Sequence, residues 1–141
     1  MNERINDKIR ELRQFLEELD EIRPASLSFY QHDLKTRAAC ERYIEKIVEA
    51  IIDLSFLAIK HLELETPEDD KQAFDILVTS KVITTELAER LKDAKGMRNI
   101  LAHQYGNVDD VIVFEAVDTE IEKDARALIA AIEMHLSKQP L

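Results

Sequence analysis

Apolar residues recur every three or four positions along most of this chain, which is the spacing of one face of an α-helix. The first such pattern covers residues 3–22 and ends before Pro24, which cannot continue a helix. A second pattern covers residues 31–64 and has two adjoining apolar stripes, which predicts a central helix with a wide buried face. At about 1.5 Å per residue this helix would extend roughly 50 Å, a length that favours a dimer or a projecting end.

Residues typical of helix starts predict two helices in the middle of the chain. Thr66 is a typical cap and Pro67 suits the first helical position, so a short helix is expected directly after them. A helix over residues 84–104 is expected next, because its apolar residues again recur at spacings of three and four.

Two further helices are expected near the C-terminus. Residues 109–117 are expected to form a short helix, although several of them are β-branched. Thr119 and Glu122 match a capping box, which predicts that the last helix starts there. Strand alternation and internal repeats are absent from the sequence, so we expect an all-α, up-and-down helical bundle. Residues 1–141 are expected to form a single domain.

Composition limits the possible partners and compartments. The net charge of −10 opposes general attraction to nucleic acid or to anionic membranes, so a polyanion would need a local site. The apolar runs are too short to span a bilayer and the N-terminal residues lack a signal peptide's apolar region, so a cytoplasmic protein without a membrane partner is expected. The single cysteine, Cys40, falls within an apolar pattern and is interpreted as a core residue, with a reactive thiol as the alternative.

The stretch from Arg98 to Tyr105 is bracketed by the only two glycines of the chain, Gly96 and Gly106. A glycine within a helix costs about 1 kcal/mol relative to alanine, so Gly96 predicts a close approach to the backbone. Gly106 is interpreted as the residue that ends the helix. Over residues 90–103 the acidic excess of the chain also reverses, because a single aspartate accompanies four cations, Arg90, Lys92, Lys95 and Arg98.

Arg98 and Tyr105 lie on a stripe of the motif helix where the pattern calls for apolar residues. A guanidinium there must be paired, at an interface or in a cleft. Asn99 and His103 form a neighbouring polar row, and Arg98 and His103 would lie about 140° apart on one straight helix. A two-fold dimer could close that gap by pooling residues from two helices. Structural roles remain open for each residue alone: an ion-pair arginine, an interface histidine or a packed tyrosine.

The motif Arg98-x4-His103-x-Tyr105, with Asn99 directly after the arginine, resembles the signature of HEPN domains of the HepT toxin type. The flanking residues 85–91 and the helix order across nearly the whole chain are similar as well. This resemblance implies an all-α homodimer that acts as a metal-independent endoribonuclease toxin, with Arg98 and His103 of both subunits as catalytic residues at a shared cleft. It also implies a minimal nucleotidyltransferase antitoxin that silences the toxin by adding AMP to Tyr105.

These residue types suit cleavage of RNA by its own 2′-hydroxyl. His103 can transfer protons near neutrality, and Arg98 presents a permanently charged fork that matches phosphate oxygens. Asn99 could support the site by orienting the imidazole or the phosphate. The four histidines lie too far apart in sequence for metal-ligand spacing, so neither a metal nor a cofactor is expected.

Two other functions remain open. One is a non-catalytic HEPN-like module that binds a nucleotide or docks on a nucleotidyltransferase. The other is a helical dimer with no site. A ribonuclease needs His103, a nucleotide binder needs Arg98 more than His103, and a scaffold tolerates the loss of both.

Overall fold

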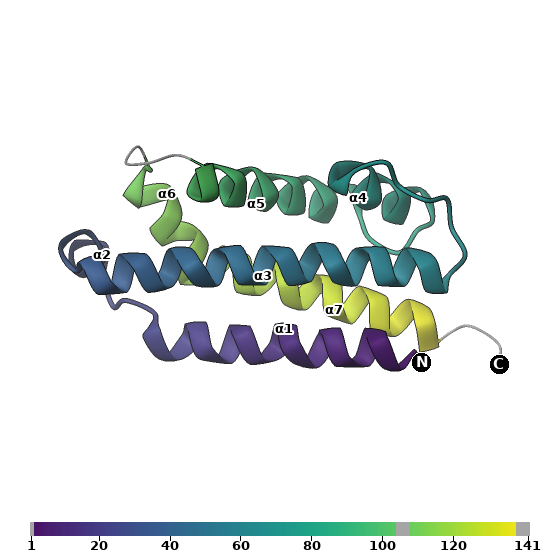
Figure 1. Ribbon diagram of the computed structural model, residues 1–141, viewed down its shortest axis with the longest axis horizontal. Helices are drawn as coiled ribbons and strands as arrows, with labels where there is room; N and C mark the ends of the chain where they lie inside the picture. The colour runs from purple at the N-terminus through teal and green to yellow at the C-terminus, as the bar shows by residue number, and fades with distance from the viewer. Residues whose placement is uncertain (1, 104–107, 138–141) are drawn as a thin grey trace.

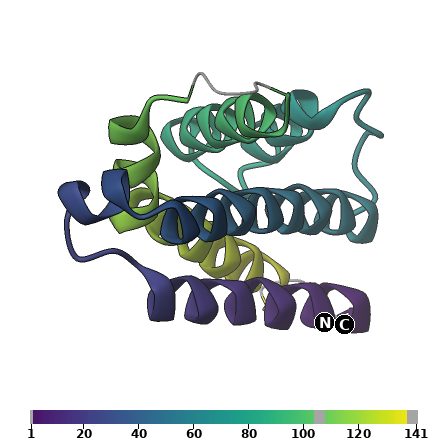
Figure 2. The same ribbon diagram turned by 60° about the vertical axis from the view of Figure 1, so that its left-hand side comes forward.

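The computed structural model describes residues 2–103 and 108–137. Four long helices run alternately up and down: α1 (Glu3–Ile22), α3 (Leu34–His61), α5 (Thr85–His103) and α7 (Ile121–Ser137). Helix α3 lies at the centre, with α1 along one side and α5 along the other, while α7 packs across α1, α3 and α5 (Figure 1). The short helix α4 (Asp70–Thr79) lies beside α5 (Figure 2). These two stretches contain no β-strand, so the predicted all-α bundle is confirmed.

Helix α1 covers the residues that its apolar pattern predicts. The Asn2 side chain caps it by accepting hydrogen bonds from the backbone N–H groups of Arg4 and Ile5. One face of the helix is buried against α3 and α7, and consists of Ile5, Ile9, Leu12, Leu16 and Leu19. Local capping and a single apolar stripe are therefore sufficient to define α1.

The predicted helix over residues 31–64 is wrong at both ends. The chain instead forms a short helix α2 (Leu27–His32) and then α3, which ends at His61. Asp33 separates the two helices because its backbone is extended and its carboxylate accepts the Thr36 N–H at 3.2 Å. On α2, the Tyr30 ring is fully buried and lies 6.1 Å from the Phe114 ring. Capping by Asp33 and burial of Tyr30 therefore outweigh the continuous apolar period.

Helix α6 (Asp110–Glu115) confirms the helix expected within residues 109–117. It continues as the π-helical segment Ala116–Glu120 and then directly into α7. The predicted capping box is wrong, because Thr119 lies inside this segment and caps no helix. The Glu122 carboxylate instead accepts hydrogen bonds from two arginines, Arg23 at 2.9 Å and Arg126 at 3.0 Å.

Cys40 lies in the core and is fully buried on α3. Burial raises the pKa of its thiol to about 11, so the thiolate needed for reactivity is scarce near neutral pH. The core interpretation is therefore confirmed and the alternative of a reactive thiol is wrong. Within the described segments, every helix is too short or too polar to cross a membrane.

Candidate functional site

Helix α5 carries the motif, and its two halves differ in burial. The Thr84 hydroxyl accepts the Leu87 N–H at 3.1 Å, and the buried side chains of the first half, Leu87, Ala88 and Leu91, anchor it to the core. From residue 94 to residue 103 none of the side chains is fully buried. The first half of α5 therefore fixes the helix, and the second half presents the motif residues at the surface.

An apolar groove runs along the exposed side of this second half. Its volume is about 650 Å³. Its lining combines an apolar part, which consists of Gly96, Met97, Ile100, Leu101, Val108, Ile112 and Val113, with the charged residues Lys71, Glu89, Lys92, Asp93 and Asp109. Ile100 and Ile112 are 48% and 52% exposed, which is unusual for large apolar side chains that serve only the core. A Cβ atom added at Gly96 would meet nothing within 4 Å. The close approach predicted at Gly96 is therefore not made within this subunit.

Arg98 lies on the side of α5 that faces α4. Its side chain is 23% exposed, and its Nη2 atom lies 3.9 Å from the Oδ2 atom of Asp70, which forms an ion pair. This distance exceeds that of a hydrogen bond, and the buried Nε atom has no hydrogen-bond partner among the atoms described. The Asp70 carboxylate thus compensates the charge of Arg98, as its position requires. Within residues 2–103 and 108–137, none of the Arg98 N–H donors makes a hydrogen bond.

Other cations near the motif are held by carboxylates of neighbouring helices. Arg90 donates to Asp124 of α7 at 2.7 Å, and Lys92 donates to Asp75 of α4 at 2.6 Å. The hydrogen bond to Asp75 raises the pKa of Lys92, which keeps this lysine charged. These short pairs tie α5 to the bundle, so they differ from the longer contact of Arg98.

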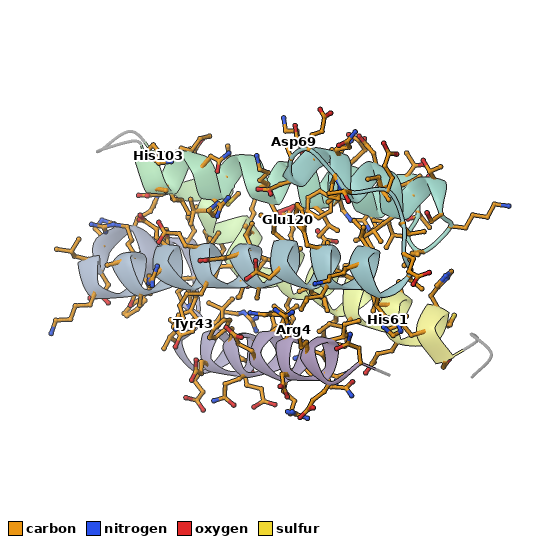
Figure 3. The ribbon with its side chains drawn as sticks, turned by 45° about the vertical axis from the view of Figure 1, so that its right-hand side comes forward. Arg4, Tyr43, His61, Asp69, His103 and Glu120 are labelled. Atoms are coloured by element: carbon orange, nitrogen blue, oxygen red, sulfur yellow. The ribbon has the colours of Figure 1, made fainter. Side chains whose placement is uncertain are left out.

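His103 is exposed in the last turn of α5 (Figure 3). Asn99, one turn earlier, is partly buried. Arg98 faces Asp70 on α4, so one subunit does not direct Arg98 and His103 toward the same point. This agrees with the angle of about 140° that helix geometry gives for a separation of five residues. Tyr105 and Gly106 lie outside the described residues.

Asp70 is the neighbour of the motif that sequence reasoning missed. It follows Asp69, whose carboxylate caps α4 by accepting the Gln72 N–H at 2.8 Å. Acidic residues are common in the first turn of any helix, because they interact favourably with the helix dipole. Nothing in the local sequence therefore separates Asp70, which faces Arg98, from an ordinary first-turn carboxylate.

Comparison with known proteins gives consistent matches over most of the chain. The family model described as ribonuclease HepT-like matches residues 5–132. The chain is 25% identical to the tRNA nuclease HepT of Aphanizomenon flos-aquae, covering 84% of this chain and 81% of the relative. It is also 25% identical to the mRNA nuclease HepT of Shewanella oneidensis, covering 86% of this chain and 91% of the relative.

A solved structure is similar in fold over nearly the whole chain. It is the tri-AMPylated HEPN toxin of Shewanella oneidensis in complex with its MNT antitoxin, with a TM-score of 0.86 and 25% sequence identity. The alignment covers 95% of this chain and 99% of that toxin. These matches confirm, at the level of the family, the predicted class of an endoribonuclease toxin of the HepT type. The chain therefore belongs to the ribonuclease HepT-like family.

Proposed function

We propose that this protein is the toxin of a toxin–antitoxin pair and cleaves RNA without a metal ion, using Arg98 and His103. The observation that carries this proposal is the state of Arg98. Its side chain is mostly buried on the motif helix, and its N–H donors make no hydrogen bond to the part of the chain that the structure describes. A guanidinium in this state can bind a phosphate as a charged fork. The names of the two HepT nucleases support RNA as the substrate. The proposed site of action is the cytoplasm.

The proposed reaction starts with attack of an RNA 2′-hydroxyl on the adjacent phosphorus. One His103 accepts the hydroxyl proton as the new O–P bond forms. The bond from phosphorus to the 5′-oxygen breaks, and a second, protonated His103 donates a proton to that oxygen. The products are a cyclic phosphate and a 5′-hydroxyl, so no water or metal is consumed. Arg98 stabilises the charge on the phosphate oxygens, and Asn99 orients the imidazole or the phosphate.

The proposed active site is shared by two copies of the chain. The apolar groove beside Gly96 gives a second copy a surface to cover, and Ile100 and Ile112 would lose their exposure to water there. A two-fold axis near this groove would bring two motif helices together. In this proposal, Arg98 and His103 of both subunits line one shared cleft.

The proposed antitoxin is a minimal nucleotidyltransferase that modifies Tyr105. The Tyr105 oxygen would attack the α-phosphorus of ATP and release pyrophosphate, leaving AMP on the tyrosine. The added phosphate could bind Arg98 and occupy the place of an RNA phosphate. The tri-AMPylated state of the Shewanella oneidensis toxin supports this regulation. Peptide mass spectrometry after co-expression with the antitoxin tests it, and an unmodified Tyr105 peptide from a silenced complex contradicts it.

A cleavage assay on cellular RNA tests the catalytic proposal. We expect His103→Ala to lower the rate at least about 100-fold, because proton transfer by a positioned side chain contributes that much. The control is His61→Ala, which removes another exposed helical histidine, at the far end of α3. We expect EDTA to leave wild-type activity unchanged. Equal activity of His103→Ala and wild type contradicts the proposal, as does complete loss of activity with EDTA.

A further inference from the structure

Asp70 of α4 is the carboxylate that faces Arg98 across the α4–α5 interface. We propose that Asp70 is a positioning residue, which holds the Arg98 guanidinium in the orientation that receives an RNA phosphate. The inference rests on the function proposed above for Arg98. It adds a residue of a different helix to the site, outside the motif of α5.

The distance between Asp70 and Arg98 suits a carboxylate that orients the guanidinium better than one that binds its N–H donors permanently. At 3.9 Å the two charges attract each other, but the hydrogen bonds of a close arginine–carboxylate pair are absent. A close bidentate pair would occupy the same N–H donors that a phosphate requires. The longer contact stabilises the charge of Arg98 in its mostly buried position and leaves those donors available.

Asp70 is itself held firmly relative to α5. The cap formed by Asp69 fixes the first turn of α4, and Phe74 and Leu77 of the same helix are fully buried. A carboxylate on such an anchored helix can restrain the long and otherwise mobile side chain of Arg98.

Removing the charge of Asp70 should therefore have two separable effects. Arg98 loses its restraint, so the transition state is stabilised less well and kcat falls. The incoming phosphate no longer meets a nearby negative charge, so KM stays constant or decreases. A residue that only stabilised the fold would lower the melting temperature without this split between kcat and KM.

Steady-state kinetics on an RNA oligonucleotide test this split. We expect Asp70→Asn to lower kcat about tenfold, with KM unchanged or lower. The matched control is Asp75→Asn, which breaks the other α4–α5 ion pair without touching Arg98, and should keep kcat within about twofold of wild type. Wild-type kcat in Asp70→Asn overturns the inference, and so does an equal loss of kcat in Asp75→Asn.

A spectroscopic measurement examines the restraint without relying on activity. In ¹⁵N NMR spectra, the Nε–H signal of Arg98 can be assigned by its loss in Arg98→Lys. Because the restrained side chain keeps its Nε atom buried, this signal should be protected from exchange with water in wild type and in Asp75→Asn. It should lose this protection in Asp70→Asn, and an unchanged signal there overturns the inference. If Arg98→Ala cleaves RNA at the wild-type rate, the proposed function of Arg98 fails, whatever the NMR result for Asp70.

Discussion

Tyr30 places a hydroxyl inside the core without a hydrogen-bond partner among the described atoms. Burial raises the pKa of this phenol well above its ordinary value. Tyr43 differs, because its hydroxyl donates to the Glu18 carboxylate at 3.0 Å on the surface of the same bundle. Comparing the two tyrosines shows how an unpaired buried hydroxyl and a hydrogen-bonded hydroxyl each affect the free energy of unfolding.

We expect Tyr30→Phe to keep or increase the free energy of unfolding at pH 7, by up to about 1 kcal/mol, because it removes an unpaired buried polar group. The control Tyr43→Phe should lose about 0.5–1.5 kcal/mol, because it removes a hydrogen bond to a charged group.

We also expect the free energy of unfolding of wild type and of Tyr30→Phe to depend differently on pH. The pKa of Tyr30 is higher in the folded state than in the unfolded state. Ionisation of Tyr30 therefore has no effect on stability below the unfolded pKa of about 10, and it favours unfolding as the pH rises above that value. The variant should therefore lose less stability above pH 10 than wild type. Urea denaturation at pH 7 and pH 10.5 measures both effects, and a large loss in Tyr30→Phe at pH 7 would show that the hydroxyl is paired.

At the scale of elements, the junction between α6 and α7 is a π-helical segment that accepts a hydrogen bond from a distant arginine. Arg23, which follows α1, donates from Nε to the Val117 carbonyl at 3.0 Å and from Nη2 to Glu122 at 2.9 Å. Val117 lies within the π-helical segment, where the regular backbone pairing of an α-helix is interrupted. Arg23 therefore satisfies a backbone carbonyl and joins the end of α1 to the start of α7.

We expect Arg23→Met to lower the free energy of unfolding by about 1–3 kcal/mol, since it leaves the Val117 carbonyl and the Glu122 carboxylate without this partner. Arg13→Met is the matched control, because Arg13 also joins α1 to α7, through a pair with Glu133 at the surface. Exposed pairs contribute about 0–1 kcal/mol, so the control should change stability little. Equal losses in both variants of a chemical denaturation series would argue against a role for Arg23 in the π-helical segment.

At the scale of the whole molecule, the side of α5 that carries Gly96 keeps apolar residues exposed to water in a single subunit. The buried faces of α1 and α7 are covered within the chain, whereas Ile100 and Ile112 remain about half exposed beside Gly96. A Cβ atom at Gly96 would have free space, so packing within the described part of the subunit does not require a glycine at this position. A second copy against this face would account for both the glycine and the exposed apolar residues.

If the proposed dimer forms through this groove, we expect Gly96→Arg to give a folded monomer and to abolish RNA cleavage, because a long charged side chain would fill the groove. Ala130→Arg is the control, since it also replaces a small exposed helical residue, on α7. Analytical ultracentrifugation gives the mass, and circular dichroism checks the helix content. A monomeric wild-type protein, or a dimeric and active Gly96→Arg variant, contradicts the shared site.

Local features of the sequence predicted most of the bundle and the motif. The bounds of α1, the presence of α4, α5 and α6, and the apolar face of α7 follow from periodicity and caps, which act over a few neighbouring residues. The HepT-type motif residues likewise lie within a single short stretch, so their resemblance to a family could be recognised without coordinates. The placement of Arg98 on an apolar stripe correctly indicated that its charge needs a partner.

Tertiary structure decided the features that depend on distant residues. The break at Asp33 combines a local cap with burial of Tyr30 near Phe114, a distant residue. The π-helical segment that replaces the expected capping box is bonded to Arg23, which is 94 residues away from Val117. The partner of Arg98 could not be read from sequence, because Asp70 is an ordinary first-turn carboxylate until α4 packs beside α5. Sequence periodicity records which face of a helix is apolar, whereas only packing determines what covers that face and which charges meet.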